Sequence, residues 1–224
     1  MTDNNFTHVP TDIETLEKIR SSLPSYISGT RLEHTYSVEK EALAISEILF
    51  PVLEIDEKYK TDISAAALLH DITKYLSADE QNHLCKEYGI ETDSYSESNT
   101  AVLHSRTAAH VAKRDFNIND FVFSAIYCHT TGKENMNLFD KIIFIADYIE
   151  KTRTHESCIT ARKYFYESIE NGLHAVDVLN KTIIMSIDFT LSFLIKKEVV
   201  IDSETIKARN FLLAEYALQR SVQE

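Results

Sequence analysis

AAALLHDITKYL, residues 65–76, places a His-Asp doublet directly after a run of five apolar residues. The apolar run predicts a buried helical segment, with His70 and Asp71 deep within that helix. An ionised Asp is almost never fully buried unless it is paired or coordinates a metal. The sequence around Asp71 therefore requires a cation close to this carboxylate.

A second acidic residue is placed in the same way. Asp147 interrupts IIFIADYI, residues 142–149, which is otherwise apolar and predicted to be helical. Either carboxylate alone has an ordinary alternative, because it could bond a neighbouring Arg or cap a helix. The two carboxylates together, with three spaced His residues elsewhere in the chain, favour a metal site.

The rest of the chain is also predicted to be helical. Its 224 residues include only 4 Gly and 3 Pro, and so few chain breakers favour long helices over short strands with tight turns. We expect an all-α fold, a helical bundle. The helices predicted from apolar periodicity span about residues 12–23, 30–50, 56–71, 77–89, 99–115, 119–130, 137–150, 156–170, 173–196 and 203–219.

The domain organisation is predicted to be simple. No repeat, low-complexity tract or Gly/Ser linker divides the chain, so residues 12–224 are expected to form one domain. Residues 1–11 are expected to be a disordered tail and residues 91–98 a polar loop. The segment from Glu198 to Ile201 could be a short extended piece, but no sheet is predicted.

Composition narrows the class of function. A formal net charge of -12 argues against binding nucleic acid through the general field of the protein, because phosphate neutralisation dominates duplex binding. No apolar run reaches the roughly 20 residues that span a bilayer, and the N-terminus lacks a signal peptide. The three Cys form no disulfide framework. We therefore expect a cytoplasmic protein, without a membrane partner, whose anionic small-molecule substrate would need a local positive site.

Six residues with ligand-type side chains form the candidate site. They lie on five predicted helices, and a helical bundle can direct such side chains to a shared core site. Imidazole and carboxylate suit Fe, Mn, Zn and related ions. Two such ions, about 4 Å apart, can activate water and stabilise in-line displacement at phosphorus. The six residues are His34, His70, Asp71, His104, His129 and Asp147.

The order of these residues, His, His-Asp, His, His, Asp, resembles the HD-domain phosphohydrolase superfamily. A closer resemblance, to the YqeK family of HD proteins, covers about Asp12 to Leu213. HTTG followed by DKIIFIADYIE is far more specific than the HD doublet. The segments that carry it are RLEHTYSV (31–38), LLHDITKYL (68–76), LHS (103–105), AIYCHTTG (125–132), FDKIIFIADYIE (139–150) and TIKARNFLL (205–213).

The resemblance implies a specific activity and ligand set. Members of that family are symmetrical diadenosine tetraphosphate hydrolases, which release two ADP. Their two metals are iron, although manganese would satisfy the same ligands. Asp71 would bridge the ions. By the same pattern, one ion would take His34, His70 and Asp147, and the other His104 and His129. Ser105, where many relatives carry Gly, departs from the pattern but is small enough to leave the ligands undisturbed.

Several residues near these ligands are candidates for contact with the substrate. Lys74 lies four residues after His70, on the same predicted helix face, and is the strongest candidate for a catalytic phosphate contact beside Asp71. Each candidate has an ordinary alternative: a surface charge for the basic residues and helix termination for the others. The substrate-binding candidates are Arg31, Lys74, Thr130, Thr131, Gly132 and Arg153, with Arg153 the weakest.

Other residues of the same chemical types are expected to be ordinary. Asp140 shares a helix face with Asp147 and is expected to play a structural or supporting role. Cys128 is expected to be a small core residue, not a nucleophile. The remaining histidines, expected to be structural or at the surface, are His8, His83, His110, His155 and His174.

Three alternatives to diadenosine tetraphosphate hydrolysis remain at this stage. The chain could hydrolyse another nucleotide, such as a deoxynucleotide or an alarmone. It could be a catalytically silent HD sensor of nucleotides, although a sensor has no need of two metals. It could be a helical interaction protein, but coincidence would then have to explain two carboxylates in apolar helices. The sequence leaves the oligomeric state and the preferred base open.

Overall fold

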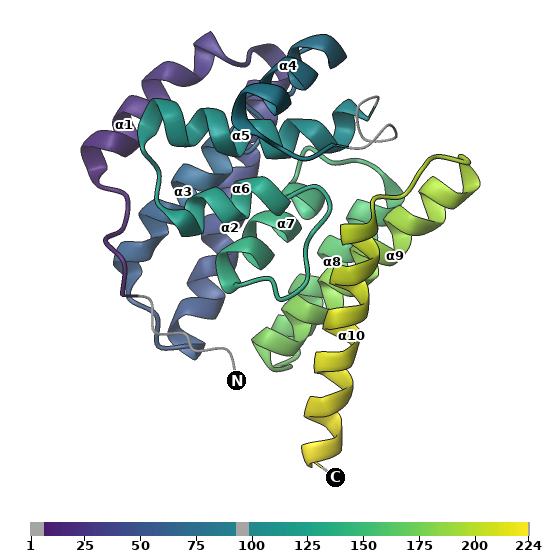
Figure 1. The fold of residues 1–224 in the computed structure, drawn as a ribbon. Helices are drawn as coiled ribbons and strands as arrows, with labels where there is room; N and C mark the ends of the chain where they lie inside the picture. The colour runs from purple at the N-terminus through teal and green to yellow at the C-terminus, as the bar shows by residue number, and fades with distance from the viewer. Residues whose placement is uncertain (1–6, 93–98, 224) are drawn as a thin grey trace.

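The fold, seen in a computed structural model that describes residues 7–92 and 99–223, is built from helices (Figure 1). The described residues contain no strand, which confirms the all-α prediction. Two short 3-10 segments, Leu23–Ser25 and Glu57–Tyr59, join some of the helices. The α-helices are α1 (Ile13–Ser22), α2 (Gly29–Val52), α3 (Lys60–Leu69), α4 (Ala78–Tyr88), α5 (Thr100–Phe116), α6 (Asp120–Cys128), α7 (Leu138–Ile149), α8 (Glu156–Glu170), α9 (Ala175–Lys196) and α10 (Ser203–Gln223).

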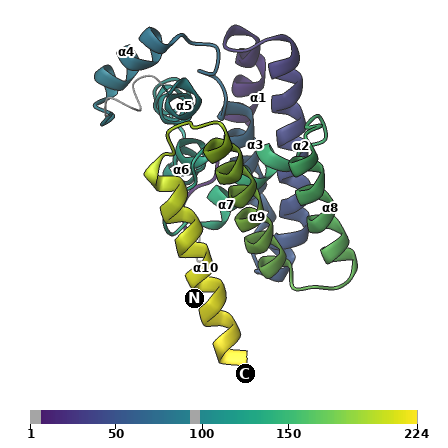
Figure 2. The ribbon, with the colours of Figure 1, turned by 90° about the vertical axis from the view of Figure 1, so that its right-hand side faces the viewer.

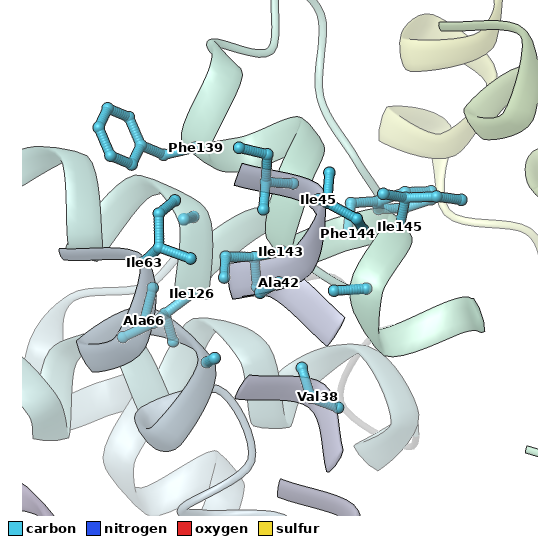
Figure 3. Packing of buried hydrophobic residues seen from close by; sticks show 14 of the residues in the cluster. Val38, Ala42, Ile45, Ile63, Ala66, Ile126, Phe139, Ile143, Phe144 and Ile145 are labelled. Atoms are coloured by element: carbon cyan, nitrogen blue, oxygen red, sulfur yellow. The ribbon is translucent and has the colours of Figure 1, made fainter. Parts of the chain in front are cut away.

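The hydrophobic core lies among α2, α3, α6 and α7. α2 packs against α3 and α7, while α6 packs against α3, α5 and α7. Figure 3 shows Ile45, Ile63, Ile126 and Ile143, one from each of the four helices, in this core, and all four are fully buried. Each such side chain contributes about 1.5–3 kcal/mol of hydrophobic free energy. Because ligand-type residues stand on or next to the same helices, this rigid packing also positions the candidate site.

The remaining helices flank the core on two sides. α4 and α5 lie on one side, and α8, α9 and α10 lie on the other (Figures 1 and 2). α10 packs along α9, and its C-terminal end projects away from the other helices (Figure 2). By length and composition α9 could cross a membrane, but half of its most apolar window is buried inside the structure. Packing against α7, α8 and α10 accounts for that buried half.

Two helices end earlier than their sequence pattern predicts. α3 ends at Leu69, so His70 is its C-cap and Asp71 lies in the turns that follow. α6 ends at Cys128, and His129 is its C-cap. The prediction that His70 and Asp71 lie deep in a helix was therefore wrong. Because His70 and Asp71 lie past the end of α3, their side chains need not follow the apolar face of that helix. The last backbone carbonyl groups of the helix also lack a helical hydrogen-bond partner.

The predicted helix caps at α4 are present. Ser77 and Glu80 form a reciprocal capping box at the start of α4, and Gly89 ends the helix with a φ of 65°. Positive φ costs Gly less than other residues, because Gly has no Cβ. The expected extended piece at 198–201 contains no strand; Glu198 is in a turn with a φ of 56°.

The end of the expected N-terminal tail is bound to the body of the protein. Residues 1–6 of this predicted tail lie outside the described residues. The buried Asp62 of α3 accepts hydrogen bonds from the Thr11 backbone N–H and hydroxyl group, and the His8 ring lies 2.7 Å from its Oδ2. Asn119, before α6, donates to the same carboxylate. Residues 8–11 therefore help to satisfy a buried charge.

Candidate metal centre

The six predicted ligand residues converge in one buried centre. His34, His104 and Asp147 project from α2, α5 and α7, while the other three follow the C-terminal ends of α3 and α6. The donor atoms form three overlapping sets, each with all atoms within 4.8 Å of one another. The sets are His34, His70 and Asp71; His70, His129 and Asp147; and Asp71, His104 and His129.

Asp71 lies at the middle of the cluster and faces two groups of histidines. Its Oδ2 is 3.8 Å from His34 Nε2 and 3.3 Å from His70 Nε2. Its Oδ1 is 3.0 Å from His104 Nε2 and 3.7 Å from His129 Nε2. Each carboxylate oxygen therefore faces a different histidine pair, which is the geometry that a ligand shared between two cations needs.

Asp147 joins the first of these two groups. Its Oδ1 lies 2.9 Å from His34 Nε2 and 3.8 Å from His70 Nε2. Asp147 follows the apolar run IIFIA (142–146), and the packing of α7 against the core holds its position. The apolar surroundings that made Asp147 conspicuous in the sequence also place it beside His34 and His70.

Hydrogen bonds at the opposite ring nitrogens orient three histidines. His70 Nδ1 lies 2.6 Å from the Ala67 carbonyl oxygen, and His129 Nδ1 lies 2.8 Å from that of Ile126. Both carbonyls are in the last turn of a helix, where helical partners are lacking. His34 Nδ1 lies 3.0 Å from Glu150 Oε1. An N–H donated from Nδ1 leaves the Nε2 lone pair directed at the centre, as a metal ligand requires.

The ionised Asp71 carboxylate and the neutral His104 ring favour a cation, whereas His34 must lose a proton to bind one. Burial of Asp71 opposes its ionisation, yet the charge of His70 and hydrogen bonds from His104 and His129 hold its pKa well below the usual range. Burial lowers the pKa of His104 to about 4, so its ring is neutral at neutral pH. The pKa of His34 is different. Burial would lower it, but hydrogen bonds to Asp147 and Glu150 outweigh burial and raise the pKa to about 9.

The residues present fit divalent metal ions. His34 Nε2 and His70 Nε2 are buried, and both face the carboxylate oxygens of Asp71 and Asp147. A buried group of imidazole and carboxylate donors is an arrangement that binds divalent metals. Ligand bonds of about 2.0–2.2 Å would separate donors on one ion by about 3–4 Å. The distances from the carboxylate oxygens to the histidine nitrogens, 2.9–3.8 Å, lie in or close to that range. The mixture of imidazole and carboxylate suits Fe, Mn or Zn.

Three basic side chains surround the centre. Arg31 Nη1 lies 2.7 Å from Asp71 Oδ2, and Arg153 Nη2 lies 2.7 Å from Asp147 Oδ1. Lys74 Nζ lies 3.2 Å from His104 Nε2, and burial lowers the pKa of this lysine. The chain bends in turns between Asp71 and Lys74, so the expected shared helix face does not exist. Lys74 reaches the centre through the turn instead, and these charges supply local positive potential in an acidic protein.

The three residues after His129 differ in their positions. Thr130 Oγ1 is 3.5 Å from His104 Nε2, and Thr130 lines a cavity beside the centre. The Thr131 hydroxyl donates to the Gly132 carbonyl, and neither Thr131 nor Gly132 lines that cavity. A Cβ on Gly132 would lie only 2.9 Å from the Cβ of Ala208 in α10. The structure thus brings Thr130 to the centre, while Thr131 and Gly132 shape the turn and its contact with α10.

Comparison with known proteins places this centre in a family. The family model of the HD domain matches residues 31–152, which include all six residues of the cluster. The chain belongs to the HD-domain family.

Several relatives of this HD-domain chain, and a solved structural neighbour, carry the names of hydrolases. Two curated relatives carry the name symmetrical bis(5'-nucleosyl)-tetraphosphatase. The protein from Staphylococcus aureus is 28% identical, over 88% of this chain and 93% of the relative. The one from Halalkalibacterium halodurans is 30% identical, over 85% and 92%. A solved Clostridium acetobutylicum structure, described as a predicted HD superfamily hydrolase involved in NAD metabolism, has a TM-score of 0.76 and 30% identity. It covers 89% of this chain and 97% of its own. The chain is an HD-type hydrolase.

Sequence reasoning missed Glu150 of this HD-type hydrolase. Glu150 is fully buried, and its carboxylate accepts hydrogen bonds from His34 and from the Thr152 hydroxyl and backbone N–H. Burial opposes ionisation of Glu150, but the hydrogen bonds from His34 and its other partners lower its pKa to about 2. The sequence offered one signal of this role, because Glu150 is a charged residue directly after the apolar segment IIFIADYI. Its partner lies 116 residues away, which no local pattern reveals.

The residues expected to be ordinary lie mostly outside the centre. Asp140 caps α7 together with Asn137 and pairs with Lys133, so its contacts are structural. Cys128 is buried, and burial raises its pKa well above the usual range, which disfavours a nucleophilic thiolate. His155 differs from expectation, because it lines the cavity beside the metal centre.

Proposed function

We propose that this HD-type hydrolase splits diadenosine tetraphosphate symmetrically into two ADP. In this proposal the six converging residues bind two divalent cations, iron or manganese, with Asp71 shared between the ions. The observation that carries the proposal is the placement of the two Asp71 oxygens against different histidine pairs. The names of the curated relatives support the choice of substrate and the position of cleavage.

The side chains around the centre would divide the remaining tasks. When bound, a pair of divalent ions supplies Lewis-acid stabilisation of developing charge and lowers the pKa of water. Lys74, Arg31 and Arg153 lie at the edge of the centre and would bind phosphate oxygens through charge-assisted hydrogen bonds. The Thr130 hydroxyl would donate a hydrogen bond to the same polyphosphate. Glu150 would hold the His34 ring in place.

The substrate class also explains the charge distribution. The overall charge of -12 repels a polyphosphate at long range. Binding therefore depends on cations gathered at one place, and the metals together with Lys74, Arg31 and Arg153 would provide them. We expect a cytoplasmic enzyme that acts on a small nucleotide and that needs neither nucleic acid nor a membrane.

A second candidate is hydrolysis of a different nucleotide. The Clostridium acetobutylicum neighbour is described as involved in NAD metabolism. NAD shares with diadenosine tetraphosphate two nucleosides joined through phosphoanhydride bonds. A substrate panel must therefore include dinucleotides with shorter phosphate bridges.

Product analysis separates these candidates. The protein, purified without chelator, is incubated with diadenosine tetraphosphate, its triphosphate and pentaphosphate analogues and NAD, and the products are resolved by ion-exchange chromatography. The proposal predicts that diadenosine tetraphosphate yields ADP alone. AMP with ATP, or no product, would contradict it, and faster hydrolysis of NAD would favour the second candidate. Absence of activity towards all substrates after loading with Fe or Mn would favour a nucleotide sensor.

A further inference from the structure

A cavity of about 520 Å³ opens directly beside the metal centre. His104, His129 and Asp147 line one end of it, so the cavity and the centre are continuous. Its volume lies in the range of about 300–1,000 Å³ typical of small-ligand sites. The other end is formed by different chemistry, namely aromatic and hydroxyl side chains. These are Phe144, Tyr148, Phe189, Thr190 and Phe193, with Ser157 beside them.

α9 supplies the outer aromatic wall of this cavity. Phe189 and Phe193 are four residues apart and therefore share one face of the helix. Phe193 is 59% exposed although it is a large apolar residue. Exposed aromatic area next to a cavity is unfavourable in water and becomes favourable when a flat apolar group covers it. Only half of the most apolar window of α9 is buried inside the structure. The face with Phe189 and Phe193 supplies part of the apolar surface that is not buried.

α7 supplies the inner wall and connects it to the metal centre. Phe144 and Tyr148 are also four residues apart, and Asp147 lies between them on the adjoining face. Tyr148, Ser157 of α8 and Thr190 of α9 all line the cavity. One rigid helix therefore sets the distance between the cations and the aromatic end of the cavity.

We propose that this aromatic end of the cavity is a nucleobase subsite, in which Phe193 and Phe189 stack on the base and favour purines over pyrimidines. The identification of the ligand as a nucleotide rests on the proposed function. Stacking strength grows with the area of the two π systems, so a purine gains more than a pyrimidine. The phosphates attached to the base would extend past Thr130 and Arg153 towards the centre. His155 and Glu156, exposed at the rim, contact solvent and leave the aromatic wall as the dominant surface.

Binding of a fluorescent purine nucleotide tests this subsite without requiring turnover. The dissociation constant of ethenoadenosine diphosphate is measured by fluorescence titration of the metal-loaded protein and two variants. Phe193→Ala should weaken binding about 5- to 100-fold, the effect expected for loss of one base–aromatic stack. Ile195→Ala is the matched control on the same helix, since Ile195 is 66% exposed and does not line the cavity. It should bind like the wild type. Phe193 is largely exposed, so neither variant should lose its fold.

Kinetic measurements extend the test to hydrolysis. Phe193→Ala should raise KM for diadenosine tetraphosphate with little change in kcat or in metal content, because the side chain touches the base and not the ligands. The wild type should bind ethenoadenosine diphosphate more tightly than it binds uridine diphosphate, whose affinity is measured by competition. If the wild type binds the purine nucleotide through Phe193 but hydrolyses no dinucleoside polyphosphate, the proposed function fails and the subsite stands.

Three results would overturn the subsite. The first is wild-type affinity in Phe193→Ala, and the second is failure of the wild type to bind the purine nucleotide. The third is an equal loss of nucleotide affinity in Phe193→Ala and Ile195→Ala, together with a sedimentation coefficient that differs from the wild-type value in both variants. That third result would make this face of α9 a contact between protein chains.

Discussion

The two carboxylate oxygens of Asp71 face opposite halves of the candidate metal centre, so loss of this side chain affects both halves. Loss of a supporting residue around a metal ligand typically costs about 10- to 100-fold in affinity or activity. Asp71→Ala should therefore reduce hydrolysis by more than about 100-fold and remove much of the bound metal. Far-UV circular dichroism should remain helical, because Asp71 lies in a turn after α3. Hydrolysis at the wild-type rate by this variant would show that the assignment of the centre is wrong.

Lys74 tests the substrate side of the same centre. Its ammonium group lies near His104 but is not among the donor atoms that could bind a metal. Lys74→Ala should keep the wild-type metal content and lower kcat/KM about 10- to 100-fold, the effect of one charge-assisted hydrogen bond. Lys74→Arg should restore part of the loss, as it keeps the charge. Metal loss in Lys74→Ala would instead give Lys74 a structural role.

A change at Glu150 tests whether its hydrogen bond to His34 strengthens metal binding. Its carboxylate accepts the His34 Nδ1–H, and neutral Gln would bond this group more weakly. Glu150→Gln should weaken metal binding about 10- to 100-fold, measured by competition with a chelator. The matched control is Glu41→Gln, since the Glu41 carboxylate is also buried and accepts a hydrogen bond from the Tyr166 hydroxyl, not from His34. Equal metal affinities in the two variants would remove Glu150 from this role.

At the scale of elements, the turn after α6 depends on the absence of a side chain at Gly132. Its φ of 68° is costly for other residues, and a Cβ would press against Ala208 of α10. Gly132→Ala should lower the free energy of unfolding by more than about 1 kcal/mol, measured by urea denaturation. Adding Ala208→Gly should restore the stability lost through contact with Ala208. The stability lost through the positive φ should remain lost. If the single variant is as stable as the wild type, neither the positive φ nor the contact with Ala208 constrains this turn.

The end of a helix was predictable from sequence at α4, which has clear end signals, and was not predictable at α3. α4 has Ser77 at its start and Gly89 at its end, and both act as expected. α3 has no such signal, because apolar Ile72 and Leu76 continue the helical spacing past its end at Leu69. Hydrogen bonds of the His70 ring and the Thr73 hydroxyl, formed only in the folded protein, replace helical bonds there.

The candidate site was predictable where single residues broke a pattern. Asp71 and Asp147 stood out because charge is rare in apolar segments. The four histidines stood out by their side-chain type and their spread over the predicted helices, and the resemblance to the YqeK family implied that all six residues are ligands. Glu150 lacked such a contrast, and its partner is distant in sequence. The aromatic residues of α9 could not be distinguished from core residues, because periodicity shows that Phe189 and Phe193 share a face but not what the face contacts.

At the scale of the whole molecule, the metal centre and the hydrophobic core support the fold separately. The core among α2, α3, α6 and α7 consists of buried apolar side chains that do not depend on metal. Removal of metal by a chelator should therefore abolish activity and lower Tm while leaving helical content unchanged. Ligand at about 100 times its Kd stabilises by ~2.7 kcal/mol, which sets the scale of this loss. Adding Mn or Fe should restore both properties, and an unchanged Tm together with unchanged activity would contradict this expectation.

The number of metal ions per chain tests the central claim most directly. Metal analysis by mass spectrometry, on protein purified without chelator, should find about two transition-metal ions per chain in the wild type. The same analysis should find markedly fewer in Asp71→Ala and the wild-type number in Lys74→Ala. Fewer than about one ion per chain in the wild type, with none gained after incubation with Fe or Mn, would contradict the claim that His34, His70, Asp71, His104, His129 and Asp147 bind a pair of cations.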